Sequence, residues 1–206
     1  MFALPAHESD AALLARVQAG DADAFAELVR RYQSALTRVA RSRLGRRDWA
    51  EDVVQETFLA AFKSCATYDP RFAFRTWLWT ILLNQCASHY QRRMRSVPTE
   101  SWSPECEAGE AESNRDDTSP LGRLLAKERT EQLEWLLSQL SGVQADALRL
   151  RFFGGLKFQE IAEAMECSLN TAKNRVRWGL MRMTELLRSA AAGAAPGDLQ
   201  QERESV

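Results

Sequence analysis

The most concentrated apolar stretch of the chain is AFRTWLWTILLNQ, at residues 73–85. When these residues are placed on a helix with about 3.6 residues per turn, one face carries the stripe typical of a core-facing helix. The members of that stripe are Phe74, Trp77, Leu78, Ile81, Leu82 and Gln85, with Trp79 and Leu83 widening it on one flank. The remaining face carries a polar row of small side chains, Thr76, Thr80 and Asn84. The pattern predicts a helix that extends to about Arg95 and has a polar row in need of a partner.

The same periodicity predicts three further helices before this one. A short helix covers about 10–18 and ends at Gly20, and a second runs from Asp23 towards Leu44 and is stopped by Gly45. The inward positions of the second helix are Phe25, Leu28, Val29, Tyr32, Leu36 and Val39. The third helix is predicted to begin with a capping box from Asp48 to Glu51, in which each side chain satisfies a free backbone N–H.

The third helix carries two different faces. Its predicted buried stripe is Val54, Phe58, Ala61 and Phe62. The adjacent face is acidic with one aliphatic residue, and consists of Asp52, Gln55, Glu56 and Leu59. Acids of this kind are common on a solvated face near a helix N-terminus, where the helix dipole favours them. A docking surface for a basic partner helix is the alternative, and the wheel geometry alone favours the solvated face.

An aromatic and basic loop precedes the apolar helix, and a basic cluster ends it. The loop contains Tyr68, Asp69, Pro70, Arg71 and Phe72, and the cluster QRRMR includes Arg92 and Arg93. Aromatic rings and arginine beside small amides and hydroxyls suit an unstacked, single-stranded base. Arginines at the helix end can neutralise phosphates. Together with the polar row, these features favour nucleic acid as the partner.

Residues 121–188 predict a second helical module that contains a helix-turn-helix. A helix from about Phe158 to Met165 buries Ile161 and Ala162, and a turn places Ser168 as N-cap of the next helix. That helix is predicted to bury Leu169, Ala172, Val176, Leu180 and Met183. Its opposite side carries Asn170, Thr171, Asn174, Arg177 and Trp178, flanked by Lys173, Arg175 and Arg182. The absence of acids on this helix until Glu185 favours a recognition helix for the major groove.

The charge distribution separates the two modules. The 206-residue chain has a formal net charge of −1, but residues 10–95 carry +5, residues 121–188 carry +3, and the segment 96–120 carries −6. That acidic segment is rich in Pro, Ser and Gly, and it predicts a flexible linker; the tail 189–206 has a similar composition. The chain therefore predicts an all-α protein with two small helical domains, at 10–95 and 121–188, joined by a flexible acidic linker.

Other classes of protein fit the sequence less well. No apolar run reaches the roughly 18 residues that a bilayer requires, and the N-terminus lacks the pattern of a signal peptide. The scattered cysteines, which are Cys65, Cys86, Cys106 and Cys167, suit a reduced cytosol. Cys86 and His89 form a lone CxxH without a second pair, so we expect no metal and no other cofactor. The sequence has no paired-carboxylate cleft and no phosphate loop for an enzyme. A helical regulator that binds DNA alone remains the alternative.

Taken together, DVVQETFLAAF, AFRTWLWTILLN, the acidic linker and LKFQEIAEAMECSLNTAKNRV resemble the extracytoplasmic-function group of bacterial sigma factors. The resemblance covers about residues 10–95 and 121–188, which correspond to sigma region 2 and sigma region 4. It implies a cytoplasmic protein that binds core RNA polymerase, through its β and β′ subunits, and promoter DNA. It also implies control by an anti-sigma factor.

The resemblance further implies a role for each candidate residue. Asp52, Gln55, Glu56 and Leu59 match the surface that docks on the clamp helices of polymerase. The residues expected to capture a flipped −10 base or the nearby backbone are Tyr68, Arg71, Phe72, Thr76, Thr80, Asn84, Arg92 and Arg93. The residues expected to read the −35 element are Asn170, Thr171, Lys173, Asn174, Arg177 and Trp178. The promoter sequence is not implied, because these positions vary within the group.

Overall fold

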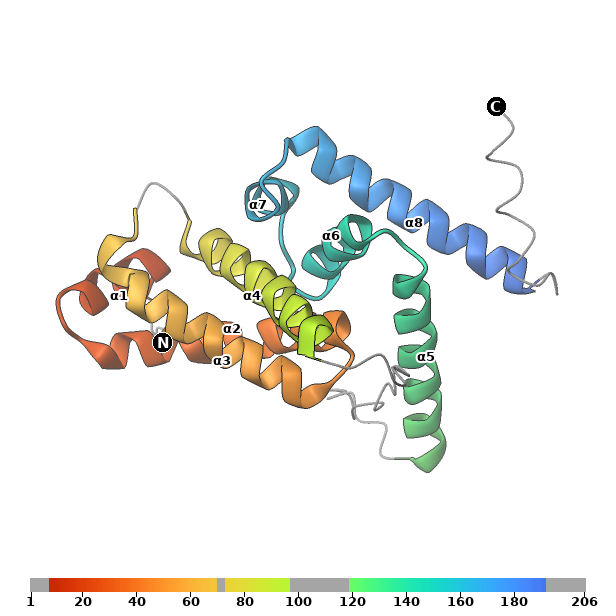
Figure 1. The fold of residues 1–206 in the computed structure, drawn as a ribbon, viewed down its shortest axis with the longest axis horizontal. Coiled ribbons are helices and arrows are strands. Elements are labelled where there is room, and N and C mark those ends of the chain that lie inside the picture. The colour runs from red at the N-terminus through yellow and green to blue at the C-terminus, as the bar shows by residue number, and fades with distance from the viewer. Residues whose placement is uncertain (1–7, 70–72, 97–118, 192–206) are drawn as a thin grey trace, which may run out of the picture.

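The computed structural model describes residues 8–69, 73–96 and 119–191, and within these ranges it contains helices and no strand. The N-terminal module comprises α1 (Asp10–Gln18), α2 (Ala22–Leu44), α3 (Arg47–Ser64), the 3-10 turn η1 (Cys65–Thr67) and α4 (Phe74–Ser96). The C-terminal module comprises α5 (Pro120–Ser138), α6 (Gly142–Phe152), α7 (Phe158–Ala164) and α8 (Leu169–Ala191). The all-α prediction is confirmed (Figure 1). Most of the predicted linker and tail, at 97–118 and 192–206, lies outside the described residues.

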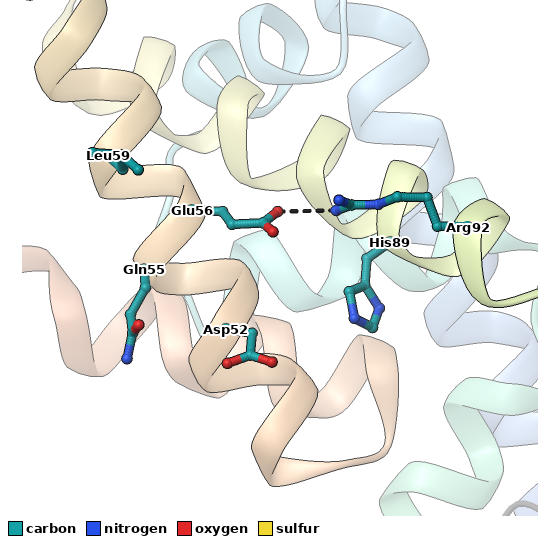
Figure 2. A pocket seen from close by; sticks show the side chains of 6 residues that line it. All are labelled: Asp52, Gln55, Glu56, Leu59, His89 and Arg92. Carbon is teal, nitrogen blue, oxygen red and sulfur yellow. Dashed lines mark hydrogen bonds and ion pairs between the residues drawn. The ribbon is translucent and has the colours of Figure 1, made fainter.

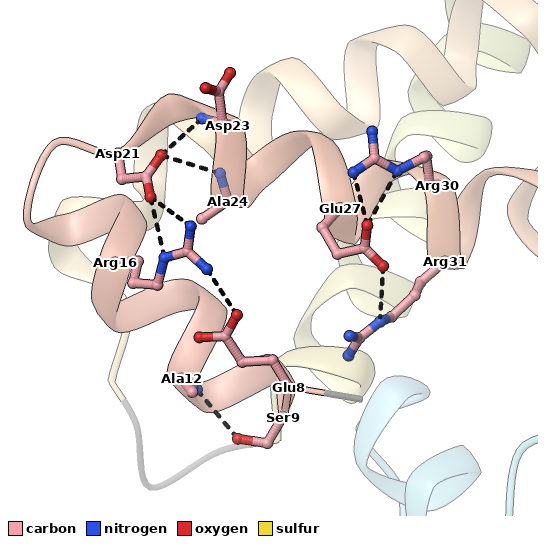
Figure 3. Close-up of polar contacts among 10 residues, drawn as sticks. All are labelled: Glu8, Ser9, Ala12, Arg16, Asp21, Asp23, Ala24, Glu27, Arg30 and Arg31. Atoms are coloured by element: carbon pink, nitrogen blue, oxygen red, sulfur yellow. Dashed lines mark hydrogen bonds and ion pairs between the residues drawn. The ribbon is translucent and has the colours of Figure 1, made fainter. Parts of the chain in front are cut away.

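The corner between α1 and α2 is held by a cluster of charged groups (Figure 3). Arg16 donates to the Asp21 carboxylate at 3.0 and 2.7 Å and to Glu8 at 2.7 Å. Asp21 also caps α2, because its carboxylate accepts from the backbone N–H groups of Asp23 and Ala24. The Arg16 guanidinium lowers the pKa of Asp21 below its usual value. The ion pair and the cap both use Asp21, so they link the end of α1 to the start of α2.

The junction between α2 and α3 was predicted in part. Gly45 ends α2 in the left-handed conformation, with φ of 74°, as expected of a helix-stopping glycine. The predicted capping box from Asp48 to Glu51 is wrong, because α3 begins at Arg47 and its N-cap, Arg46, makes no side-chain cap hydrogen bond. The two acids pair with arginines instead: Asp48 lies 2.9 Å from Arg46 and Glu51 lies 2.7 Å from Arg47.

Most predicted core positions are buried, and the exceptions lie at the edges of their stripes. Phe62 was predicted to be buried but is 44% exposed, although its ring contacts Phe25 edge-on at 5.1 Å. Leu169 and Leu180 were also predicted to be buried and are 39% and 42% exposed. The reason is that α6 and α7 pack on a narrower side of α8 than the wheel assumed. The buried positions on that side are Ala172, Val176, Gly179 and Leu186.

Helix α4 is buried over a wider arc than its own stripe predicted. It packs on α2 and α3 on one side and on α7 of the C-terminal module on another (Figure 1). Trp79, predicted to lie on the flank, has no exposed surface, whereas Trp77 and Ile81 are only half-buried. Thr76, a member of the polar row, is 5% exposed. The second module therefore shifts the buried side of α4 towards Trp79.

Candidate nucleic-acid and protein interfaces

A shallow groove with acidic residues on one wall lies between α3 and the C-terminal half of α4 (Figure 2). The α3 side contributes all four residues predicted to bind polymerase, and α4 contributes the other two; the groove is lined by Asp52, Gln55, Glu56, Leu59, His89 and Arg92. Successive turns of α3 place the four side chains together because they recur at i, i+3, i+4 and i+7. Leu59 is 52% exposed, so an apolar group stands among the acids. We call this feature the acidic groove.

An arginine that was predicted to bind DNA lies in this groove. Arg92 of α4 reaches across and forms an ion pair with Glu56 at 3.0 Å (Figure 2). Both side chains are substantially exposed, at 59% and 42%, so the pair is worth little in water. A basic partner can therefore displace Arg92 from Glu56 at small cost. The structure thus brings Arg92 together with the predicted polymerase-binding set.

The predicted polar row on α4 is not uniformly exposed. Thr76 is buried, and its hydroxyl has no hydrogen-bond partner among the described residues. The Thr80 hydroxyl is half-buried and donates to the backbone carbonyl of Thr76 at 3.1 Å, while Asn84 is exposed. Only the end of the row that carries Thr80 and Asn84 is open to a ligand in this arrangement.

An aromatic surface adjoins the open end of the polar row. Tyr68 contacts Trp77 at 5.0 Å between ring centroids, and both rings are half-buried. Burial raises the pKa of Tyr68, so its phenol stays neutral at ordinary pH. Trp77 was assigned to the core stripe and was not predicted to face a ligand. The signal available for a ligand-facing position was its i, i+7 spacing from Asn84, which places both residues on one helix face.

Three other residues predicted to contact the −10 element have no described side chain. Arg71 and Phe72 lie outside the described residues. Arg93 lies within α4, but its side chain is not among those described. Their roles stay predictions.

Helix α8 presents its predicted face to solvent. Trp178 is 60% exposed, and Asn170, Lys173 and Arg177 are exposed as well. Thr171 and Asn174 are half-buried on the same helix. The sequence did not single out Met181, which is 60% exposed one turn after Trp178 and Arg177. We call this set of residues the α8 face.

Local contacts hold the α8 face in position. Ser168 is the predicted N-cap, and its hydroxyl accepts from the backbone N–H of Thr171 at 3.1 Å. Gly179 allows α8 to lie close to α6, because an added Cβ would come within 2.9 Å of the Leu148 side chain. A rigid helix whose outer side is basic and amide-rich can enter the major groove of duplex DNA.

The described cysteines are free thiols, and Cys65 and Cys86 are buried. Within those parts, no cluster of three or more His, Cys, Asp or Glu side chains is placed to hold a metal ion. Burial raises the pKa of Cys86 to about 11, which keeps its thiol protonated and makes it a poor ligand. None of the helices in the described ranges is both long and apolar enough to cross a membrane.

Comparison with known proteins agrees with this arrangement. Residues 28–96 match the family described as Sigma-70 region 2, and residues 130–183 match Sigma-70, region 4. The ECF RNA polymerase sigma-E factor of Haemophilus influenzae is 32% identical over 174 residues, which cover 82% of this chain and 89% of the relative. The RNA polymerase sigma-H factor of Pseudomonas aeruginosa is 32% identical over 171 residues, with the same coverage of both chains.

Two solved structures are also similar to this chain. One is the structure of CnrH in complex with the cytosolic domain of CnrY, at 25% identity and a TM-score of 0.67, covering 88% of this chain and 99% of the matched chain. The other is the sigma factor RpoE in complex with the anti-sigma factor NepR from Bartonella quintana. It is 26% identical, with a TM-score of 0.61, and covers 80% of this chain and 96% of that one.

The chain therefore belongs to the extracytoplasmic-function (ECF) group of the sigma-70 family. It is a transcription initiation factor that directs RNA polymerase to promoters, and it is not an enzyme.

Proposed function

We propose that the acidic groove on α3 is the docking site for the clamp helices of core RNA polymerase. The observation that carries this proposal is the exposed Leu59 beside Asp52 and Glu56, an apolar contact within an acidic rim. A basic helix with one apolar anchor complements such a surface in both charge and shape. A regulator that binds DNA alone gives this groove no role.

Charge reversal in the groove tests the docking site. Asp52→Lys with Glu56→Lys should abolish co-elution with core polymerase on a sizing column, while circular dichroism stays helical. The matched control is Asp48→Lys with Glu51→Lys, which reverses two acids on the same helix that do not line the groove. Loss of binding in both double variants would indicate a nonspecific charge effect, and binding by the groove variant would contradict the proposal.

We also propose that α4 holds the single-stranded −10 base. Trp77 and Tyr68 supply a surface on which a base can stack, and the exposed amide of Asn84 supplies hydrogen bonds to its edge. An extruded base needs an aromatic face and nearby polar groups, and this side of α4 provides both. The loop residues Arg71 and Phe72 are proposed to complete the site.

The −35 element is proposed to be read by the α8 face. We propose that the side chains of Lys173, Asn174 and Arg177 reach base edges or phosphates in the major groove. Trp178 and Met181 are proposed to pack against sugar or thymine methyl groups beside them. Asn170 and Thr171 lie in the first turn of α8, and we propose that the N-terminus of this helix approaches the phosphate backbone.

We propose that an anti-sigma factor controls this protein in the cytoplasm. The support is that the similar sigma factor RpoE has been solved in complex with the anti-sigma factor NepR, and that the similar protein CnrH has been solved in complex with the cytosolic domain of CnrY. The acidic linker is proposed to lie near the path of RNA in polymerase, where its charge of −6 would imitate nucleic acid. Neutralising its acids should alter abortive products more than promoter binding.

A further inference from the structure

The aromatic surface proposed for the −10 base belongs to a set of four contacting rings. Tyr68 and Trp77, whose centroids lie 5.0 Å apart, both contact the buried ring of Phe74, at 6.3 and 5.9 Å. Phe74 in turn meets the ring of Tyr32 on α2 edge-on at 5.8 Å. Because rings in edge-to-face contact restrict one another's orientation, the position of Tyr32 influences the surface that a base would meet.

The Tyr32 end of this set is tied to α1 by hydrogen bonds. The Tyr32 hydroxyl donates to one carboxylate oxygen of Asp10, the first residue of α1, and Arg31 donates to the other oxygen at 2.7 Å. Burial raises the pKa of Tyr32, so its hydroxyl keeps the proton that it donates. Hydrogen bonds to a carboxylate are about twice as strong as those between neutral groups. Asp10 therefore holds the Tyr32 side chain with one oxygen and Arg31 with the other.

Helix α1 supports the aromatic set at a second point. The side chain of Gln18, the last residue of α1, donates to the backbone carbonyl of Cys65 at 2.9 Å. The same carbonyl accepts from the backbone N–H of Tyr68 at 3.2 Å, so α1 also fixes the turn that leads to this ring. The match to Sigma-70 region 2 begins at residue 28, which leaves α1 before the matched segment and without an assigned role.

We propose that Asp10 is a positioning residue for recognition of the −10 base, and that it acts through Tyr32 and Phe74 without touching the base. The inference rests on the proposed −10 site of α4 and goes beyond it, because it makes α1 part of promoter reading. A binding site is precise only when packing and hydrogen bonds lock the rotamers of its residues. Loss of the Asp10 contact lets the rings of Tyr68 and Trp77 turn, which weakens stacking of the base and leaves the −35 contacts unchanged.

The test compares the binding of holoenzyme to two forked promoters. Each has a duplex −35 region and a single-stranded −10 element, with a sequence that the wild-type holoenzyme selects from random DNA. One promoter is intact, and the other has an abasic site at the position where loss of the base weakens wild-type binding most. The ratio of the two affinities is the base preference, which a general loss of stability or of polymerase binding does not change.

Breaking the contact between Asp10 and Tyr32 should reduce the base preference. Asp10→Ala and Tyr32→Phe should each lower it about three- to tenfold, while affinity for the abasic promoter stays within about twofold of the wild-type value. The double variant should lose no more than Asp10→Ala alone, because both changes break the same contact. Asp10→Asn should keep most of the preference, since its amide oxygen can still accept from the Tyr32 hydroxyl.

The matched control is Arg16→Gln, which also weakens the attachment of α1. The ion pairs of Arg16 join α1 to Asp21 and Glu8 rather than to Tyr32 (Figure 3). This variant should keep the wild-type base preference. Circular dichroism and thermal unfolding verify that each variant is folded, and Tyr32→Phe retains the ring that packs on Phe74.

The possible failures are distinguishable. An unchanged base preference in Asp10→Ala and Tyr32→Phe would overturn the role of Asp10. A loss in Arg16→Gln as large as that in Asp10→Ala would also overturn it, because any weakening of α1 would then have the same effect. Absence of a base preference in the wild-type holoenzyme would instead contradict the proposed −10 site itself.

Discussion

Helices α4 and α8 are both 23 residues long and both carry candidate DNA-reading side chains, yet they acquire their exposed faces differently. On α8, one side packs on α6 and α7, part of the helix also contacts α5, and the face that includes Trp178 is exposed to solvent. On α4, the helices of its own module cover one side and the second module covers another, which buries Trp79 and Thr76. The accessible surface of α8 is thus a local property, whereas that of α4 depends on where region 4 lies.

The largest expected effect comes from comparing one tryptophan on each helix. Trp79→Ala should lower the free energy of unfolding by about 3–5 kcal/mol, because it removes a fully buried ring from the junction of the modules. Trp178→Ala should change it by less than about 0.5 kcal/mol, because the ring is 60% exposed. Urea unfolding measures both values. Equal losses would show that the two helices are not buried differently.

A second prediction separates duplex reading from reading of the opened strand. Asn174→Ala should weaken holoenzyme binding by about 1–3 kcal/mol on a duplex promoter and on one with a pre-opened bubble, because the −35 contact is present in both. Asn84→Ala should leave −35 protection intact and impair open-complex formation and the −10 base preference. Footprinting and permanganate reactivity report the two steps. Loss of −35 protection in Asn84→Ala would refute this division between the helices.

Two threonines one turn apart on α4 test how far the buried side of this helix extends. Thr76→Val should stabilise the fold by about 1 kcal/mol, because it replaces a buried hydroxyl that has no partner among the described residues. Thr80→Val should cost about 0.5–1 kcal/mol, because it removes the hydrogen bond to the Thr76 carbonyl. Both substitutions keep a β-branched side chain, so helix propensity changes little. Thermal unfolding compares them, and destabilisation by Thr76→Val would show that its hydroxyl is satisfied.

The smallest expected effect concerns Arg92, for which the sequence and the structure suggest different partners. Arg92→Ala should change the free energy of unfolding by less than about 0.5 kcal/mol, because its ion pair with Glu56 is exposed. If Arg92 acts mainly in the acidic groove, the variant should alter affinity for core polymerase. Its affinity for single-stranded −10 DNA should then keep the same salt dependence. A reduced salt slope with unchanged polymerase affinity would restore Arg92 to the DNA-binding set.

Much of the architecture could be predicted because its signals act over a few residues. The apolar periodicity predicted the helices of both modules, Gly45 was predicted to end α2, and Ser168 was predicted to cap α8. The predicted capping box of α3 is wrong because the helix begins at Arg47, so Asp48 lies inside its first turn and cannot be the N-cap. Side chains at i, i+3 and i+4 on one helix were grouped correctly in the acidic groove, since helix geometry alone places them together.

By itself, the sequence determined the helical elements, the acidic surface of α3 and the exposed face of α8, because each depends on spacing within a single helix. Only the tertiary structure decided that Thr76 is buried, that Trp79 lies at the junction of the modules and that Arg92 meets Glu56. Arg75 and Gly154 illustrate the reason, since they are 79 residues apart in the chain and hydrogen-bonded in space. A helical wheel records which residues share a face, but the burial of that face depends on the distant segment that packs against it.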